Sequence, residues 1–369
     1  MAIEMHNQRI LKFSYTRSDG KVAGRELLSS INSRIIDDIF GDGVIAITVR
    51  SAVNNNFVRK LSQLYGWLDG LDVALAHECV KIIRQNNCSL VYIEGSNYGR
   101  LAKFIKDNCP SCRVVSFFHN VEARFFWGAL RQKPSIKKVG VLFANFFAER
   151  LAVKYSDEII CLTERDRKML GRIYGKEGDH VVPISVSKSG NVLKSQLGIL
   201  PKESQSFGIF VGGAFYANIE AVRWLAKNDI ATSECPIYVL GRGFENYIEE
   251  FADYSNLVIV GEVDSLDAWY VQAFFSIAPI FDGSGMKTKV AESLMYGRPI
   301  LATSEAFVGY EDVKNSAGFV CDNPACFKRA INRLIDGSVI FDEQELKSLY
   351  NAKFSYDASR ERMERILIS

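Results

Sequence analysis

Short runs of apolar residues alternate along the whole chain with longer stretches in which apolar residues recur at helical spacing. Each apolar run has the length and composition of a strand that is buried on both faces. In the first half the predicted strands are Ile10–Tyr15, Val44–Val49, Leu90–Ile93, Val114–Phe118 and Glu158–Leu162. In the second half they are Gly208–Gly212, Ile237–Gly241, Leu257–Gly261, Phe275–Pro279, Pro299–Thr303 and Gly318–Val320. This alternation predicts an α/β protein with parallel sheets covered by helices.

The stretches between these strands predict helices. They run from near Arg25 to Ile35, over a long zone from Asn56 to Asn87, from near Thr163 onward, and through Ala221–Leu225. Thr163 and Asp166 approximate a capping box in which Asp replaces the usual Glu or Gln. The right-handed crossover rule then makes each half of the chain a doubly wound domain.

A stretch rich in Ser, Gly and Lys, Ser185–Ser206, separates the two series of strands and helices. We therefore expect two Rossmann-like domains, residues 1–187 and 188–350. A C-terminal helix over residues 351–369 is expected to pack back on the first domain. Two such domains facing each other enclose a central cleft at the carboxyl ends of their strands, where open α/β sheets bind ligands.

Composition narrows the class of protein. A length of 369 residues suits two domains, and the balance of 48% hydrophobic and 24% charged residues is that of a soluble globular protein. A net charge of +2 argues against a dedicated nucleic-acid binder. The first residues do not read as a signal peptide, and no apolar run reaches membrane-spanning length, so a cytoplasmic location is expected.

The eight cysteines are accordingly expected to be reduced thiols. Cys109 and Cys112 have the C-x-x-C spacing of zinc and redox sites. With no second pair and no histidine cluster nearby, neither a zinc site nor a redox role is favoured.

A glycine turn followed by a helix carries the strongest chemical signal. The predicted strand ends in Asp282-Gly-Ser-Gly, and a helical pattern then continues to Gly297. Free N–H groups at a helix N-terminus, with the helix dipole, can hold a diphosphate, and Lys287 and Lys289 add positive charge. Glu292, one turn further, can accept hydrogen bonds from sugar hydroxyls. An ordinary tight turn and first helical turn explain the same residues, and no Walker or G-x-G-x-x-G motif matches.

Several segments of the second half agree with one family. They are the FVGG run at 210–213 with Asn218 and Ala221–Leu225 after it, VLGRG at 239–243, VGEVD at 260–264 and GSGMKTKVAE at 283–292. Together they resemble the nucleotide-sugar-binding half of family 4 retaining glycosyltransferases, which have the two-domain GT-B fold. In the first half, Phe118–Glu122 (FHNVE) is similar to a motif from a bacterial branch of that family, which builds surface polysaccharides such as capsule or lipopolysaccharide.

The resemblance implies roles for individual residues. The second domain would bind the nucleoside diphosphate of a sugar donor, such as UDP or GDP. The implied donor-binding residues are Gly212, Gly213, Arg242, Asp282, Gly283, Ser284, Gly285, Met286, Lys287, Thr288, Lys289 and Glu292. Glu292 matches the second glutamate of the E-x7-E motif, which bonds the ribose. Asp282 stands near the first, but two residues too far away. The basic residues expected after the first strand of this domain are replaced by Gly212–Ala214, and Arg242 or the two lysines would compensate.

The resemblance also implies the chemistry. His119, Lys287 and Glu292 are the expected catalytic residues, with His119 hydrogen-bonded to the donor sugar. Retention would follow from front-face attack within the ion pair of diphosphate and sugar. No cofactor is implied, and no D-x-D motif follows a strand, so no metal is expected. Acceptor-side candidates are Asp19, Gly20, Glu94, Asn120 and Glu122.

A segment of the first half raises the possibility of membrane contact. Trp127–Phe147 mixes aromatic residues with Arg131, Lys133, Lys137 and Lys138, a composition that suits the surface of an anionic bilayer. Such contact would place the protein at the inner face of the cell membrane, near a lipid-linked acceptor. The alternative is that the apolar residues pack in the first domain while the basic residues are solvated.

The sequence therefore favours a retaining hexosyltransferase that moves a sugar from a nucleoside-diphosphate donor to a glycan or lipid-linked acceptor. A nucleotide-sugar epimerase or a phosphorylase of the same fold is a second hypothesis. An epimerase would need further carboxylates around the sugar, and a phosphorylase a lysine that carries pyridoxal phosphate; neither can be located. A non-catalytic protein that binds a nucleotide sugar is a third hypothesis, because the first motif glutamate and the basic pair depart from the pattern.

Overall fold

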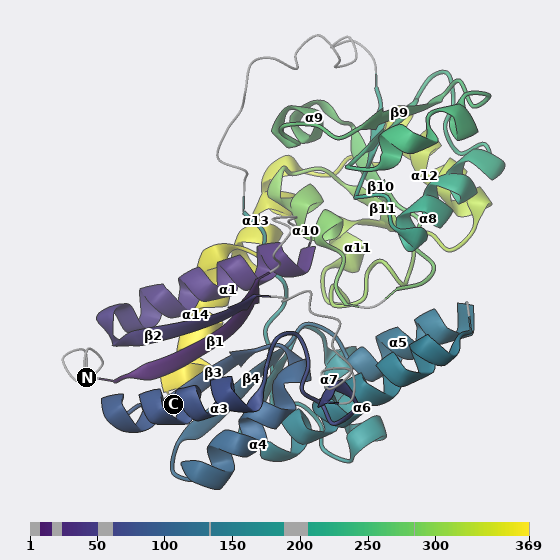
Figure 1. Cartoon of the computed structure of the whole chain (residues 1–369). Coiled ribbons are helices and arrows are strands. Elements are labelled where there is room, and N and C mark those ends of the chain that lie inside the picture. Colours follow the sequence, from purple (N-terminus) through teal and green to yellow (C-terminus); the bar gives the residue numbers. More distant parts are fainter. Residues whose placement is uncertain are drawn as a thin grey trace. The chain divides into compact units, whose positions relative to one another are not determined.

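The computed structural model describes residues 8–16, 24–50, 62–132, 134–187, 206–283 and 285–368. The chain divides into two compact units, of which unit 1 comprises Met1–Ile184 with Ser359–Ser369 and unit 2 comprises Ser185–Ala358. Figure 1 shows the helices and strands of both. Asp19, Gly20, Lys133, Ser284 and most of the expected linker lie outside the described residues.

Unit 1 is built on a parallel sheet with the strand order β2-β1-β3-β4-β5-β6. Its strands are β1 (Ile10–Thr16), β2 (Val44–Arg50), β3 (Leu90–Glu94), β4 (Arg113–Phe118), β5 (Glu158–Cys161) and β6 (His180–Val181). The five strands predicted for this half are confirmed. The sixth has two residues, too few for an apolar run to stand out in the sequence.

Helices cover both faces of this sheet. They are α1 (Gly24–Phe40), α3 (Val73–Asn86), α4 (Gly99–Asn108), α5 (Glu122–Gln132), α6 (Ile136–Tyr155), α7 (Glu164–Tyr174) and α14 (Tyr356–Ile368), with short 3-10 turns η2 (Gly41–Gly43) and η3 (Ser96–Tyr98). The predicted cap at the start of α7 is confirmed, because Thr163 Oγ1 accepts a hydrogen bond from the Asp166 N–H at 2.9 Å.

The single long helix expected between Asn56 and Asn87 is wrong for residues 65–72. Gly66, Asp69 and Gly70 all have positive φ, at 83°, 47° and 85°, a conformation that ends a right-handed helix. A new helix, α3, begins after Asp72, whose Oδ1 accepts from the Leu75 N–H at 2.9 Å. The glycines were visible in the sequence, but the left-handed Asp69 was not.

Unit 2 repeats the architecture with a parallel sheet in the order β12-β11-β10-β7-β8-β9. Its strands are β7 (Gly208–Val211), β8 (Ile237–Leu240), β9 (Leu257–Gly261), β10 (Phe275–Ala278), β11 (Ile300–Ala302) and β12 (Gly318–Val320). Its helices are α8 (Tyr216–Lys227), α9 (Asp267–Gln272), α10 (Thr288–Met295), α11 (Lys314–Ala317), α12 (Pro324–Ile335) and α13 (Glu343–Lys353), with 3-10 turns η5 (Phe244–Tyr247) and η6 (Glu249–Phe251). All six predicted strands are confirmed.

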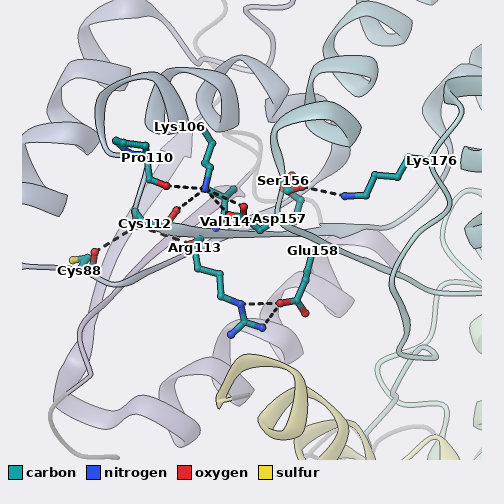
Figure 2. Close-up of polar contacts among 11 residues, drawn as sticks. Cys88, Lys106, Pro110, Cys112, Arg113, Val114, Ser156, Asp157, Glu158 and Lys176 are labelled. Carbon is teal, nitrogen blue, oxygen red and sulfur yellow. Dashed lines mark hydrogen bonds and ion pairs between the residues drawn. The ribbon is translucent and has the colours of Figure 1, made fainter.

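An ion pair at the amino ends of β4 and β5 holds the last helix on unit 1. Figure 2 shows Arg113 beside Glu158, with Arg113 Nε 2.8 Å from Glu158 Oε1. The same guanidinium donates to the carbonyl oxygens of Ile366 at 2.6 Å and Leu367 at 3.0 Å. These carbonyls stand at the end of α14, where the helix leaves its own acceptors unsatisfied. Residues 351–353 belong to α13, and the final helix begins at Tyr356.

The C-x-x-C segment forms a polar turn next to this ion pair. Lys106 Nζ donates to the carbonyl oxygens of Pro110 and Cys112 and binds Asp157 at 2.9 Å (Figure 2). The Cys112 thiol donates to the Cys88 carbonyl, and burial raises its pKa to about 12. All eight cysteines are free. Across the described residues, no cluster of three or more His, Cys, Asp or Glu side chains is placed to hold a metal ion, and no helix is long and apolar enough to span a membrane.

We predict that Arg113→Ala loosens α14 locally. Hydrogen bonds from a charged donor are worth roughly 2 kcal/mol each when partly buried, so amide exchange in α14 should become at least about tenfold faster. Hydrogen–deuterium exchange with mass spectrometry measures this. The matched control is Arg365→Ala on the same helix, whose i,i+4 pair with Glu361 is exposed and worth little. Equal exchange in the two variants would show that Arg113 does not hold the helix.

Candidate functional site

Each sheet has a point where the strand order reverses direction, and polar residues collect there. In unit 2 the chain runs outward from β7 through β8 to β9, then crosses to β10 on the other side of β7. In unit 1 it passes from β1 to β2 and then crosses to β3. Loops on either side of such a point separate at the carboxyl edge of the sheet and leave a crevice that suits a ligand. The predicted site residues follow β7, β8 and β10 in unit 2 and β3 and β4 in unit 1.

After β7 the backbone itself lines the site. Gly212 and Gly213 follow β7, and Gly241 follows the neighbouring strand β8. A Cβ atom on Gly241 would overlap the Gly212 carbonyl, and a Cβ on Gly212 would fall 2.5 Å from Asn218 Nδ2. The lack of a side chain at Gly212 and Gly241 therefore lets these two loops pack directly on each other and on Asn218.

Lys289 extends from α10 to this glycine loop and is buried, with 7% of its surface exposed. Its Nζ donates to Asn218 Oδ1 at 3.0 Å and lies 4.1 Å from the centroid of the Phe210 ring. Lys289 forms no ion pair with the residues that the structure describes. Burial lowers its pKa to about 7, although Glu292 favours the charged form. A buried ammonium that lacks a counter-ion is a natural partner for an anion.

The glycine turn after β10 positions the second lysine. Asp282 Oδ1 accepts from the Gly283 N–H at 2.8 Å, and Gly283 and Gly285 have φ of 140° and 66°. Lys287 stands at the N-cap of α10, where its Nζ donates to the Gly285 carbonyl at 3.0 Å and lies 3.8 Å from Glu305 Oε1. Its own carbonyl accepts from the Tyr310 hydroxyl at 2.9 Å. The turn thus leads into the N-terminus of α10, where the hydrogen bond from Tyr310 fixes the backbone.

Glu292 lies one turn along α10 from Lys289. Its Oε2 accepts from the Tyr270 hydroxyl at 3.0 Å, and a further hydrogen bond comes from the Thr288 side chain. Tyr270 stacks on Tyr296, with ring centroids 4.8 Å apart and planes 6° from parallel. Burial raises the pKa of the Glu292 carboxyl, while these hydrogen bonds oppose that effect. The two tyrosines were not singled out from the sequence, because Tyr270 belongs to α9 and meets Glu292 of α10 only in the fold.

The remaining donor-side candidates are less closely associated with Lys289 and Glu292. Arg242 follows β8 and is exposed, and its guanidinium pairs with Glu262 at 2.7 Å. Met286 is buried against Gly309, and a Cβ on Gly309 would lie 2.5 Å from Met286 Cγ. Met286 therefore packs against the turn from the protein interior. The structure therefore joins Gly212, Gly213 and Lys289 in one cluster, and it places Arg242 in a separate ion pair.

In unit 1 the structure joins two candidates that the sequence listed separately. His119 follows β4 and Glu94 ends the neighbouring strand β3, and His119 Nε2 lies 2.7 Å from Glu94 Oε1. Both are almost fully buried, at 5% and 3% exposed. Because a carboxylate only accepts, Nε2 carries the proton in this contact. His119 Nδ1 has no hydrogen-bond partner among the described residues.

Further polar groups orient Glu94. The Asn32 amide donates to Glu94 Oε1 at 2.9 Å, the Tyr92 hydroxyl donates to Oε2, and the Ser29 hydroxyl lies 3.5 Å from Oε1. A buried carboxylate with this many donors is held in one geometry, and it holds the His119 ring in turn. Sequence reasoning missed Asn32, Ser29 and Tyr92, which come from α1 and from within β3.

The other acceptor-side candidates lie at the start of α5. Asn120 is half-buried in the turn before the helix. Glu122 opens the helix, and its N–H donates to Glu149 Oε1 at 2.9 Å. Glu149 is fully buried on α6 and also accepts from the Ala123 N–H and the Tyr174 hydroxyl. Glu149 thus caps α5, because its carboxylate accepts hydrogen bonds from the free N–H groups of the first helical turn. Burial raises the pKa of Glu149.

The aromatic segment between Trp127 and Phe147 has two faces. Ala144 and Ala148 of α6 are buried against unit 1, whereas Trp127, Val139 and Phe143 are 54%, 52% and 58% exposed. One face of the segment therefore packs in the domain and the other leaves aromatic side chains on the surface, and membrane contact stays a prediction.

Comparison with solved structures establishes the class of fold. Sucrose-phosphate synthase from Thermosynechococcus elongatus aligns over 97% of this chain and 98% of its own, with 10% identity and a TM-score of 0.71. HepE from Anabaena, solved in complex with UDP, aligns over 98% and 99%, with 14% identity and a TM-score of 0.67. WaaG, a glycosyltransferase involved in lipopolysaccharide biosynthesis, aligns over 97% and 99%, with 13% identity and a TM-score of 0.60.

A family model matches part of the second unit. Residues 206–337, which hold the glycine loops, both lysines and Glu292, match the model of the family described as Glycosyl transferases group 1. No curated protein sequence matches the chain. This match places residues 206–337 with the group 1 glycosyltransferases, and the whole chain has the GT-B fold of the solved structures above.

We predict that Lys289 makes folding stability depend on pH. Its pKa is about 7 in the folded protein and 10.5 when unfolded, so between these values the unfolded chain binds more protons. Stability should therefore rise with pH above 7, by at most about 1.4 kcal/mol per pH unit. Lys289→Met should lack this rise, and Lys227→Met, an exposed lysine on α8, should keep it. Urea unfolding at pH 7, 8 and 9 compares the three proteins. Parallel curves for Lys289→Met and the unmodified protein would show that Lys289 is charged throughout.

Proposed function

We propose that this protein transfers a hexose with retention from a nucleoside-diphosphate sugar to a glycan or lipid-linked acceptor in the synthesis of a surface polysaccharide. The observation that carries the proposal is Lys289, a buried lysine with no ion-pair partner in the described structure, beside the glycines that follow β7 and β8 at the switch point of unit 2. A diphosphate supplies the missing negative charge, and main-chain N–H groups can bind its oxygens.

The donor is assigned to unit 2 by the chemistry of its residues. Gly212, Gly213 and the turn at 283–285 offer backbone to the diphosphate, with Lys287 and Lys289 as the adjacent charges. Glu292, already fixed by Tyr270, accepts hydrogen bonds from two ribose hydroxyls. Asp282, Met286 and Thr288 shape the turn, and Arg242 is available to the outer part of the nucleotide once its surface pair with Glu262 opens.

Transfer then depends on charge stabilisation. As the bond between the sugar and the diphosphate breaks, negative charge grows on the leaving phosphate, and the helix N-terminus and lysines oppose it. A single well-placed donor of this kind is worth roughly 3–4 kcal/mol in the transition state. These groups supply the positive charge that a bound cation provides in other transferases. Attack by the acceptor hydroxyl on the face that the diphosphate leaves retains the anomeric configuration.

His119 is proposed to hydrogen-bond the donor sugar through Nδ1, the ring atom whose hydrogen bonding is incomplete. Glu94 fixes the ring through Nε2. Glu94 is thus a positioning residue for His119 and not an acceptor contact. Asn120 and Glu122 follow His119 in the chain and remain acceptor-side candidates, together with Asp19 and Gly20.

Two related structures support the finer assignments. HepE was solved with UDP and, separately, with UDP-glucose, so UDP-glucose is the first donor to test. WaaG takes part in lipopolysaccharide biosynthesis, which supports a bacterial surface glycan as the product. The free cysteines agree with a cytoplasmic site of action. We place the protein at the inner face of the cell membrane, in contact through residues 127–147.

We predict that Glu292→Ala abolishes stabilisation by nucleoside diphosphates. UDP at a hundred times its dissociation constant should stabilise the native protein by about 2.7 kcal/mol, and the variant loses the ribose contact. A thermal-shift panel of UDP, GDP, ADP, CMP and their sugars measures this for both proteins. Glu220→Gln, an exposed glutamate on α8, is the control. If Glu292→Ala binds UDP as well as the unmodified protein, the ribose assignment fails.

We predict that His119→Ala retains the UDP-dependent thermal shift but lowers transfer by about a hundredfold, since a polar contact to the reacting sugar is lost. Glu94→Gln, which keeps the shape but cannot hold an Nε2 proton as firmly, should give an intermediate rate. Turnover of UDP-glucose with a glycan acceptor, and its hydrolysis without one, provide the rates. Full activity in His119→Ala would assign the residue to packing, and binding without any turnover in the unmodified protein would favour a non-catalytic role.

A further inference from the structure

Two cysteine side chains of unit 2 meet where β12 ends and α12 begins. Cys321 directly follows β12 and is fully buried, whereas Cys326 lies in the first turn of α12 and is half-buried. Their sulfur atoms are 2.7 Å apart. The S–S bond of a disulfide is about 2.05 Å long, so the two sulfurs stand less than about 1 Å from bonding distance.

The backbone holds both cysteines in this arrangement. The Cys321 N–H donates to the Ala302 carbonyl of β11 at 2.8 Å, which extends the pairing of β11 with β12 by one residue. The Cys326 N–H donates to Oδ1 of Asn323, the N-cap of α12, at 3.0 Å. Because a strand ladder fixes one residue and a helix cap fixes the other, the fold itself keeps the sulfurs together.

The two thiols differ in their access to solvent. A reagent in solution can reach Cys326, but Cys321 has no exposed surface. Burial also raises the pKa of the Cys321 thiol. Cys321 is therefore a poor first nucleophile, yet it stands against the sulfur of Cys326 and can attack that sulfur once it carries a leaving group. An accessible cysteine beside a resolving cysteine is the usual arrangement of a redox-sensitive pair.

The turn between the cysteines also supports a loop beside the donor-site candidates. The Asp322 carboxylate accepts hydrogen bonds from the Ser304 N–H at 2.8 Å and from the Ser304 hydroxyl at 2.6 Å. The next residue, Glu305, has its Oε1 3.8 Å from Lys287 Nζ. The turn at 321–326 is therefore joined to Lys287 through one short loop.

We propose that Cys321 and Cys326 are a modification site, at which a low-molecular-weight disulfide such as oxidised glutathione forms a reversible intramolecular disulfide. The Cys326 thiolate attacks one sulfur of the reagent, which gives a mixed disulfide and releases one thiolate. The Cys321 sulfur then attacks the Cys326 sulfur, and its proton leaves with the second thiol. The two cysteines are oxidised, the reagent is reduced to two thiols, and an added thiol reductant reverses both steps. The closed ring stiffens the turn and, through Asp322, the loop beside Lys287.

Mass spectrometry of the full-length protein tests each step. After oxidised glutathione and alkylation of the remaining thiols, trypsin releases both cysteines on one peptide, residues 315–328. We expect this peptide to be unalkylated and two hydrogen atoms lighter, and dithiothreitol to restore both thiols. Cys321→Ser should instead keep glutathione on Cys326, because no thiol displaces it. Cys326→Ser should gain no adduct, because Cys321 is buried.

The matched control is Cys235→Ala, which removes a buried cysteine of the same unit and should leave ring closure unchanged. Two alkylated cysteines in the peptide from the treated, unmodified protein would overturn the proposal. A glutathione adduct that persists on Cys326 beside an intact Cys321 would do the same, since Cys321 would then be unable to resolve it.

Ring closure should also slow local opening. Amide exchange at Ser304 and Cys321, whose N–H groups are bonded around this turn, should become at least about threefold slower on oxidation. Cys326→Ser should show no change under the same treatment. Hydrogen–deuterium exchange with mass spectrometry measures this, and equal exchange in the oxidised and reduced proteins would refute the stiffening of the loop.

This inference does not depend on the proposed function, and the two can fail separately. Neither cysteine belongs to the proposed donor site, so the reduced Cys326→Ser variant should keep the UDP-dependent thermal shift of the unmodified protein. Ring closure in a protein that does not bind UDP would support the dithiol and refute the donor site. UDP binding without ring closure would refute the dithiol and leave the donor site intact.

Discussion

The constraint on which both units depend is that their sheets are parallel and buried on both faces. Backbone groups inside such a sheet are satisfied by the ladder, and side chains on either face are mostly apolar, with hydrogen-bonded exceptions such as Lys12 and Ser276. Polar side chains are admitted where the strands end. β3 illustrates this, since Leu90–Ile93 are apolar or aromatic and the first carboxylate, Glu94, is its last residue. Because parallel strands end at one edge, residues distant in sequence become neighbours there.

That constraint explains what could and could not be predicted from the sequence. The strands were recognisable, because buried parallel strands appear as short apolar runs, and the turn at 282–285 was recognisable from its glycines. The contacts between side chains were not. Glu94 and His119 were both candidates, but their pairing depends on β3 and β4 being adjacent and in register. Lys289 and Asn218 are 71 residues apart and meet only because β10 crosses back to β7.

Buried charges in the two units differ in how completely they are satisfied. Glu149 accepts from two backbone N–H groups and a tyrosine, and Glu94 accepts from an amide, a hydroxyl and a histidine. Such carboxylates are parts of the fold, because their desolvation is offset by hydrogen bonds already present. Lys289 has one side-chain acceptor and the face of Phe210. Burial lowers the pKa of Lys289, and a bound anion would favour its charged form.

Burying Lys289 costs free energy, and the lysine can serve an anion site only if α10 cannot shift and expose it to solvent. Several buried contacts hold the helix in place. Ser293 Oγ accepts from Ser276 of β10 at 2.7 Å and donates to the Arg298 carbonyl, while Tyr310 binds the carbonyl of Lys287 at the other end. With both ends of α10 anchored, Lys289 and Glu292 are held in place by contacts that do not involve a ligand. Electrostatic stabilisation of a leaving group requires charges that need not reorganise during the reaction. In the proposed transfer, the anchoring of α10 therefore matters as directly as the charges it carries.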